Sequence, residues 1–371
     1  MTAITIEVNA ASASYVVHIE PGLAHRLPEH LEKLPAGSKL GIVTTQPIFD
    51  LHGAALQSAM TGAGYDVTLA VIPDGEPFKT LETAASLYTT LIEAGFDRQS
   101  TLVSLGGGVV GDLTGFVAAT YLRGIGFIQI PTTLLAMVDA SVGGKTGVNH
   151  PLGKNLIGAF HQPLAVLIDP GFLRTLPARQ MRAGLAEMLK MGLIADPDYL
   201  DLLLASLADF KEPLDDGPAG SLIATACRLK ADIVSADERE TNRSTTAGRR
   251  LLNFGHTLGH AIEAVAGYGK LLHGEAVALG MVGAAYLSAE IAGLPFDSVA
   301  RIEAMVAQLK PPGIGSLDPE QLAATIARDK KRLQGTLHWV LLKQIGAPVI
   351  SGAVQPDTLS AAIDRLQRRF P

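Results

Sequence analysis

The stretch Thr101-Leu-Val-Ser-Leu-Gly-Gly-Gly-Val-Val-Gly-Asp112 decides the fold, because a short apolar strand runs directly into glycines and then into a helix. Gly106, Gly108 and Gly111 satisfy the G-x-G-x-x-G spacing of dinucleotide-binding turns. Glycines let the backbone approach a pyrophosphate, and the helix N-terminus offers amides and a positive dipole. The alternative is an ordinary tight turn. The motif is not on the first strand, and no acidic residue follows about 20 positions later, so we expect a variant of the usual geometry.

Strands and helices alternate on both sides of this stretch. Period-two or short apolar patterns predict strands at 4–8, 15–19, 40–43, 67–71, 127–130 and 164–168, with helices at 48–63 and 80–94. Such alternation is typical of a parallel sheet covered by helices. We therefore expect an N-terminal α/β domain, residues 1–169, with a parallel Rossmann-like sheet.

The pattern changes after Asp169-Pro170, where apolar residues begin to recur at intervals of three and four. This spacing predicts helices at 181–194, 222–234, 276–291, 299–309 and 359–366. One segment, 336–342, reads as a strand or hairpin instead. We expect residues 170–371 to form an all-α domain.

Composition narrows the class of protein. The chain has 371 residues, 47% of them apolar and 18% charged, which suits a folded enzyme of two domains. A net charge of −6 argues against nucleic acid as a partner. The longest apolar run, 276–287, is too short to span a bilayer. Because Cys227 is the only cysteine and the first residues lack a signal-peptide pattern, we expect a cytoplasmic protein without membrane partners.

Histidines gather in one part of the predicted helical domain. His256 and His260 are four residues apart and would share one face of a helix, and His273 follows one loop later. A catalytic zinc commonly takes three protein ligands and keeps one position open. The alternative is a helix with solvated or capping histidines.

Two lysines lie among glycines between Pro131 and Asn155. Lys145, Lys154 and Asn155 are suited to holding an oxyanion such as a phosphate, although exposed lysines are often merely solvated. The segment is not a P-loop, because Asp139 occupies a position where that motif requires glycine, so ATP or GTP hydrolysis is disfavoured. Upstream, Asp74-Gly-Glu76 could offer a carboxylate to ribose hydroxyls.

Taken together, these segments resemble the 3-dehydroquinate synthases, which are sugar phosphate cyclases of the shikimate pathway. The matching segments, in chain order, are 74–79, 106–112, 123–124, 131–155, 160–163, 184–190, 253–263 and 273–275. The resemblance covers nearly the whole chain, and it implies an NAD-binding domain, a helical metal-binding domain and an active site in the cleft between them.

The resemblance also implies roles for individual residues. The metal, Zn2+ or Co2+, would be held by Glu187, His256 and His273, which makes His260 a catalytic residue rather than a ligand. NAD+ would contact Asp74, Gly75, Glu76, Lys79, Gly107, Gly108, Val109, Val110, Gly111, Asp112, Thr132, Thr133, Lys145, Lys154, Phe172 and Thr175. Substrate and catalytic contacts would come from Asp139, Lys145, Lys154, Asn155, Lys190, Lys230, Glu240, Arg249, Asn253 and His260.

Arg123 would enter the site of a neighbouring subunit, which implies a homodimer, and one of Lys330 and Lys331 would reach the phosphate. The segment between Glu240 and Arg249 is longer than the family pattern. Arg249 is preferred to Arg250 because it lies four residues before Asn253.

The implied reaction converts 3-deoxy-D-arabino-heptulosonate 7-phosphate to 3-dehydroquinate and phosphate, for aromatic amino acid biosynthesis. It proceeds through transient oxidation by NAD, phosphate elimination, reduction, ring opening and an intramolecular aldol closure. Three alternatives remain. The first is a cyclase for a neutral sugar phosphate, which would not need Lys230 and Arg249 to bind a carboxylate. The second is a metal-dependent alcohol or glycerol dehydrogenase, which would need no residues for phosphate binding. The third is a non-catalytic nucleotide-binding protein.

Overall fold

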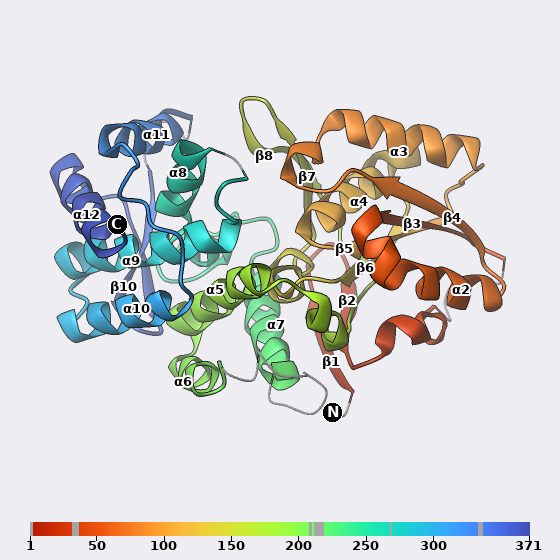
Figure 1. Cartoon of the computed structure of the whole chain (residues 1–371), viewed down its shortest axis with the longest axis horizontal. Helices are drawn as coiled ribbons and strands as arrows, with labels where there is room; N and C mark the ends of the chain where they lie inside the picture. The colour runs from red at the N-terminus through yellow and green to blue at the C-terminus, as the bar shows by residue number, and fades with distance from the viewer. Residues whose placement is uncertain (1–2, 32–36, 208–209, 211–218, 268, 333–336) are drawn as a thin grey trace. The chain divides into compact units, whose positions relative to one another are not determined.

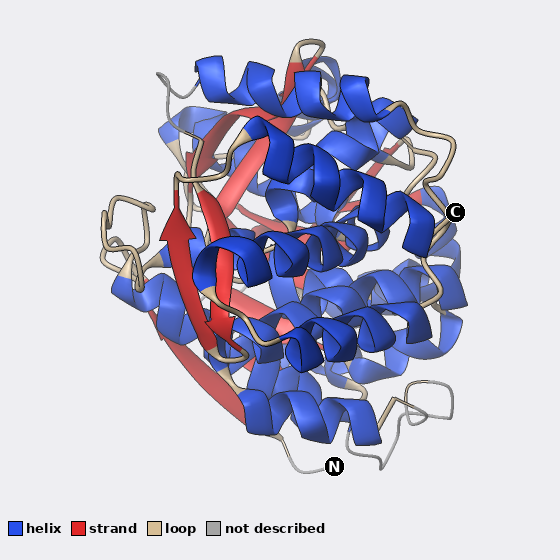
Figure 2. Ribbon diagram, turned by 90° about the vertical axis from the view of Figure 1, so that its left-hand side faces the viewer, coloured by secondary structure: helices blue, strands red, loops and turns tan. Residues whose placement is uncertain are grey.

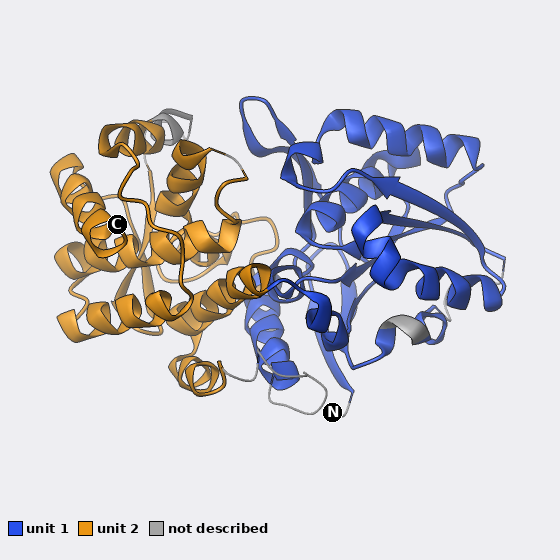
Figure 3. Ribbon diagram, viewed as in Figure 1, with its two compact units in different colours: residues 1–177, 209–235 blue, residues 178–208, 236–371 orange. Residues whose placement is uncertain are grey.

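The computed structural model describes residues 3–31, 37–207, 210, 219–267, 269–332 and 337–371, and only the backbone at 24–25 and 328–332. The chain divides into two compact units (Figure 3). The first comprises residues 1–177 and 209–235, and the second comprises residues 178–208 and 236–371. The sequence pattern places one boundary near residue 170 and gives no sign that 209–235 belongs with the first unit.

A seven-stranded sheet forms the centre of the first unit (Figures 1 and 2). Its strands, in spatial order, are β1 (Ile4–Asn9), β2 (Ser14–Ile19), β9 (Ala165–Ile168), β6 (Gly126–Pro131), β5 (Thr101–Gly106), β3 (Lys39–Thr45) and β4 (Asp66–Ile72). β1 pairs antiparallel with β2, and the other neighbours in the sheet pair in parallel. The expected Rossmann-like domain is confirmed, with a mixed, mostly parallel sheet.

Helices cover this sheet. They are α1 (Gln46–Ile48), α2 (Ala54–Gly62), α3 (Leu81–Glu93) and α4 (Gly108–Thr120), with a π-helical turn, η2 (Phe49–Gly53), between the first two. A further helix, α7 (Ala219–Ala236), contacts segment 136–140 through Cys227 and Lys230. The chain passes from β3 to β4 in one direction along the sheet and from β4 to β5 in the other. Right-handed crossovers therefore put α2 and α3 on opposite faces. The reversal leaves a topological switch point between the carboxyl ends of β3 and β5, where open α/β sheets bind their ligands.

The lysine- and glycine-rich run folds into a β hairpin that its sequence pattern does not predict. β7 (Lys145–His150) pairs antiparallel with β8 (Gly153–Phe160), and Gly147 lies opposite Gly158. A Cβ at Gly147 would fall 2.6 Å from the Ile157 carbonyl oxygen, and one at Gly158 would fall 2.3 Å from that of Thr146. The two glycines therefore let the strands approach closely.

The second unit is mainly helical. Its helices are α5 (Ala178–Ala195), α6 (Pro197–Ala205), α8 (His256–Ala266), α9 (His273–Ala292), α10 (Phe296–Gln308), α11 (Pro319–Arg332) and α12 (Pro356–Arg369). The strand or hairpin expected at 336–342 is β10 (Trp339–Gln344), which pairs with β11 (Ala347–Ser351); residue 336 itself lies outside the described residues. By length and composition α9 could cross a membrane, but most of it is buried within the protein, as in the core helix of a globular unit.

Candidate functional site

Three potential metal ligands converge in the second unit. Glu187 lies within α5, whereas His256 and His273 are the first residues of α8 and α9. The Nε2 atoms of both histidines lie 3.7 Å from Oε1 of Glu187. One ligand atom from each residue falls within 4.8 Å of the other two, a spacing that suits a single bound ion.

Glycines allow these helices to pack closely enough for the ligands to meet. A Cβ at Gly274 would lie 2.0 Å from the Ala183 carbonyl oxygen, and a Cβ at Gly280 would lie 2.0 Å from that of Gly255. Gly255 also takes φ +79°, a left-handed conformation that glycine adopts at little cost, and His256 follows it directly. The local geometry of all three helices therefore depends on residues without a side chain.

The electrostatics of this cluster fit a divalent cation. Glu187 is 1% exposed, and neither of its carboxylate oxygens accepts a hydrogen bond, although the Lys190 ammonium lies against Oε2. Burial, reinforced by the charges of Lys190, His273 and His260, holds the pKa of His256 well below its usual value. His256 is therefore a neutral imidazole at pH 7. A buried carboxylate with an unsatisfied oxygen and two imidazoles form a donor set typical of catalytic zinc.

His260 lies beside the cluster but is not among its ligands. Its ring centre is 5.4 Å from that of His256 and 5.7 Å from that of His273. The spacing of His256 and His260 alone would have paired them as ligands. Sequence reasoning assigned no role to Glu263, a buried carboxylate whose Oε2 lies 3.7 Å from Nδ1 of His273.

In the first unit, the glycine turn has the expected strand–turn–helix context. β5 ends at Gly106, Gly107 caps the helix, and α4 begins at Gly108. Val109, Val110, Gly111 and Asp112 form the first turns of α4. A Cβ at Gly111 would fall 2.7 Å from Oε1 of Gln129 on β6, so a larger residue here would displace that side chain.

Two buried hydroxyls lie at the carboxyl ends of the two parallel strands that flank β5. Thr45 ends β3 and Thr132 directly follows β6, and neither hydroxyl has a hydrogen-bond partner. Buried polar groups without a partner are costly and call for a ligand or water. Thr132 was predicted, as was Thr133, whose methyl group lies against Gly107. Thr45 was missed; its position at the end of a predicted strand is the signal that could have found it.

A hydrogen-bonded network joins the predicted cofactor and phosphate residues of the first unit. Lys79, only 3% exposed, donates to Asp112 at 2.5 Å and to Oδ1 of Asn155 at 2.6 Å. Burial raises the pKa of the Asp112 carboxyl, and Lys79 opposes that rise. Nζ of Lys154 lies 3.7 Å from Oε1 of Glu76. Asp74 and Gly75 directly precede Glu76 in the sequence.

Other predicted residues of this unit lie in three places. Lys230 on α7 is buried and donates both to the Asp139 carbonyl oxygen at 2.6 Å and to its carboxylate. The Thr175 hydroxyl shares a hydrogen bond of 2.9 Å with Nε2 of His52. The ring of His52 packs on Phe172. Lys145 is exposed at the start of β7.

Arg123 occupies an unusual backbone segment. It is exposed, and both Leu122 and Arg123 take left-handed φ values, +48° and +71°, before Gly124. Non-glycine residues in this region are strained, and such strain clusters at functional positions.

Arg249 and its neighbours are organised by an aspartate that sequence reasoning missed. Asp237 accepts hydrogen bonds from the backbone N–H groups of Thr241, Asn242 and Arg249 at 2.9–3.2 Å. Burial alone would raise the pKa of this carboxyl, but these three bonds, together with the charge of Arg249, outweigh burial and hold the pKa below the usual value. Arg249 is 3% exposed and donates to the Glu238 carbonyl oxygen.

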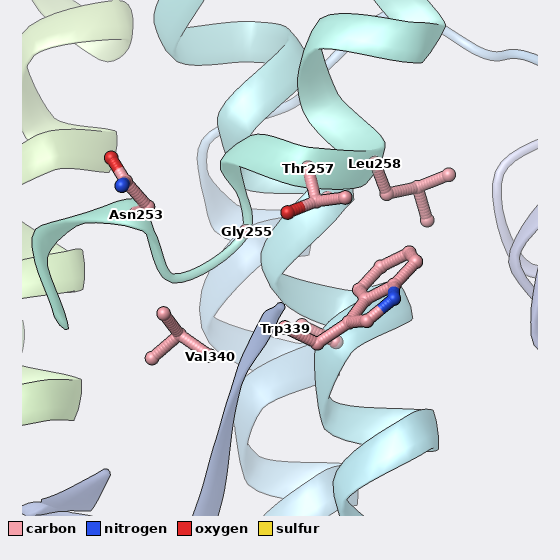
Figure 4. Close-up of a pocket in the computed structure, with 8 residues that line it drawn as sticks. Asn253, Gly255, Thr257, Leu258, Trp339 and Val340 are labelled. Atoms are coloured by element: carbon pink, nitrogen blue, oxygen red, sulfur yellow. The ribbon is translucent and has the colours of Figure 1, made fainter. Parts of the chain in front are cut away.

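Asn253 lies on the turn before α8, where its amide donates to Glu240 at 3.3 Å. It also lines a small pocket with Thr257, Leu258 and the buried Trp339 (Figure 4). The side chains of Lys330 and Lys331 lie outside the described residues, so the prediction that one of them reaches the phosphate stays open.

Known proteins are similar to this chain over nearly its whole length. The model of the 3-dehydroquinate synthase N-terminal region matches residues 69–183, and that of the C-terminal region matches residues 184–332. A 3-dehydroquinate synthase from Rippkaea orientalis is 42% identical over 97% of this chain and 98% of its own length.

Solved structures extend the similarity. A 2-epi-5-epi-valiolone synthase from Streptomyces hygroscopicus, with NAD+ and Zn2+ bound, has a TM-score of 0.88 at 31% identity, over 96% of this chain and 98% of that one. A 2-deoxy-scyllo-inosose synthase complexed with carbaglucose-6-phosphate, NAD+ and Co2+ has a TM-score of 0.82 at 24% identity, over 99% and 100% of the two chains. The latter shows the common fold.

Proposed function

The chain belongs to the 3-dehydroquinate synthase family, and we propose that it converts 3-deoxy-D-arabino-heptulosonate 7-phosphate to 3-dehydroquinate and phosphate. The observation that carries this proposal is the convergence of Glu187, His256 and His273 in a member of that family. The reaction belongs to the shikimate pathway, and it fits an intracellular enzyme.

The cofactors of the proposed reaction are NAD+ and Zn2+ or Co2+. When bound, NAD supplies transient oxidation at C5 of the substrate, and the metal supplies positive charge that holds and acidifies the C5 hydroxyl. Glu187, His256 and His273 would hold the metal. Thr132, Thr133, the glycine turn, Glu76 and Lys79 would bind NAD.

The remaining residues would bind and orient the substrate. Lys145, Lys154 and Asn155 provide cationic and amide donors for its phosphate. His260 lies beside the ligand cluster and is exposed. His260 can therefore reach the substrate and move a proton between the substrate and the phosphate. Lys190 lies against Glu187 and would hold a hydroxyl near the metal. Local cations such as Lys145 and Lys154 would let a chain of net charge −6 bind a multiply charged anion.

Two features support a carboxylate-bearing substrate over a neutral sugar phosphate. Arg249 is a buried cation fixed by the Asp237 turn, and a buried arginine is suited to bidentate carboxylate binding. Lys230 is a second buried cation, paired with Asp139. The similarity to a valiolone synthase keeps the neutral substrate as the rival.

We also propose a homodimer in which Arg123 completes the site of the second subunit. Its support is the strained, exposed backbone that presents Arg123, together with exposed apolar side chains on the same unit, among them Leu122, Leu156 and Phe160.

A substrate comparison tests the assignment. The metal-loaded enzyme with NAD+ is given either the heptulosonate 7-phosphate or a neutral seven-carbon sugar phosphate, and phosphate release is measured. We expect turnover with the acid only, and we expect Arg249→Met to raise the KM for the acid by about 100-fold, because a charged hydrogen-bonded pair is lost. Turnover of the neutral sugar alone would transfer the assignment to the rival cyclase.

A further inference from the structure

Asn149, the fifth residue of β7, contacts three of the residues assigned to cofactor and phosphate binding. Its Nδ2 donates to Oε1 of Glu76 at 2.8 Å, and its Oδ1 accepts from the backbone N–H of Asn155 at 2.9 Å. Its own backbone N–H donates to the Lys79 carbonyl oxygen at 2.7 Å. The side chain thus uses its donor on one segment and its acceptor on another.

Asn155 needs such support. It takes φ +53°, a left-handed conformation that non-glycine residues adopt only when the surrounding structure holds them there. The hydrogen bond from its N–H to Asn149 fixes the backbone at this point, and its side chain accepts from Lys79. A closed circuit of hydrogen bonds therefore joins Asn149, Asn155 and Lys79. Asn149 also binds Glu76, which attaches that residue to the circuit.

The circuit joins two segments that are far apart in the sequence. Glu76 and Lys79 lie on the turn after β4, whereas Asn155 lies on the hairpin β7–β8. The ion pair between Lys154 and Glu76 is long, at 3.7 Å, and partly exposed, so solvent weakens it. The amide of Asn149, with two short hydrogen bonds, makes the firmer connection.

We propose that Asn149 is a positioning residue that holds the NAD-binding turn and the phosphate-binding hairpin in one fixed arrangement. This inference rests on the proposed function, because that function assigns Glu76 and Lys79 to NAD and Asn155 to the phosphate. It follows that NAD affinity and substrate affinity share one structural support.

Two substitutions separate the two hydrogen bonds of the side chain. Asn149→Ala removes both. Asn149→Asp keeps the acceptor for Asn155 but turns a carboxylate toward Glu76. The NAD+ dissociation constant is measured by calorimetry without substrate, and KM and kcat are measured at saturating NAD+.

We expect Asn149→Ala to raise both the NAD+ dissociation constant and the substrate KM by about tenfold, with a smaller change in kcat. We expect Asn149→Asp to weaken NAD+ binding to the same extent while its KM stays closer to that of the wild type. The control is His150→Ala, an exposed neighbour on β7 whose ring accepts from the Leu152 N–H at 3.1 Å outside the circuit.

The inference is overturned if Asn149→Ala leaves both constants within about twofold of the wild type. It is equally overturned if both Asn149 variants and His150→Ala change all constants alike, since the effect would then be general loosening of the hairpin. A wild-type protein without turnover would contradict the proposed function, yet NAD+ calorimetry would still test Asn149.

Discussion

Gly274 packs directly against Ala183, so that a Cβ at Gly274 would fall 2.0 Å from the Ala183 carbonyl oxygen. This contact puts the start of α9 against the backbone of α5. His273 precedes Gly274, and Glu187 lies one helical turn beyond Ala183. The distance between His273 and Glu187 therefore depends on the close approach of α9 to α5, which Gly274 allows because it has no side chain.

Gly274→Ala should weaken metal binding, because the added methyl group forces the two backbones apart. We expect a loss of about tenfold or more in Zn2+ affinity, measured by competition with a chelator, together with a destabilisation of about 1–3 kcal/mol from overpacking. The matched control is Gly62→Ala on α2, where an added Cβ meets nothing within 4 Å. Equal metal affinity in both variants would show that the contact does not set the ligand spacing.

Lys79→Met should destabilise the protein strongly, because it leaves the Asp112 carboxylate without its cation. Removing one partner of a buried ion pair costs about 3–5 kcal/mol. Burial already raises the pKa of Asp112, and loss of Lys79 would raise it further. The double variant Lys79→Met/Asp112→Asn should therefore recover much of the loss in urea unfolding at pH 7. A double variant no more stable than Lys79→Met would contradict this account.

Asp237→Asn should lose stability in a pH-dependent way. The folded-state pKa of Asp237 is lowered, so its contribution is fully present above the ordinary carboxyl pKa of about 3.9 and is lost as pH falls through the folded pKa. The difference in unfolding free energy between wild type and variant should be largest near pH 7 and should shrink toward pH 3. Urea unfolding across this range measures it, and a difference independent of pH would argue against an ionised Asp237.

The Cys227 thiol should be inert in the folded protein. Burial raises its pKa to about 12, against the opposing charges of Lys230 and Arg228. Because the thiolate is the reactive form, a disulfide reagent at pH 8 should modify Cys227 only after the protein unfolds. Stoichiometric modification within seconds under native conditions would contradict the buried position.

The sequence was sufficient for much of the first unit. A short apolar run such as 101–106 is typical of a strand that is buried on both faces, and the structure shows such a strand there. The glycine turn follows in its expected place. The hairpin β7–β8 gave no such signal, because glycines and lysines interrupt its alternation. The association of α7 with the first unit was also hidden, since its periodicity shows that one face is buried but not what buries it.

The candidate metal site shows the same division. Histidine spacing pointed to the correct helix but favoured the pair His256 and His260. The structure instead brings His256 together with Glu187 and His273. Glu187 lies in an apolar helical segment and carries no local signal of its own, so only the family resemblance identified it. Asp237 and Thr45 were missed because their roles depend on backbone groups and strand order.

One measurement tests the central claim most directly. The metal-loaded protein is mixed with NAD+ and 3-deoxy-D-arabino-heptulosonate 7-phosphate, and phosphate release and the NADH absorbance band are followed together. The proposed reaction predicts many equivalents of phosphate per subunit with no lasting NADH, and complete loss of both after chelation of the metal. NADH that accumulates without phosphate would contradict the cyclase and indicate a dehydrogenase.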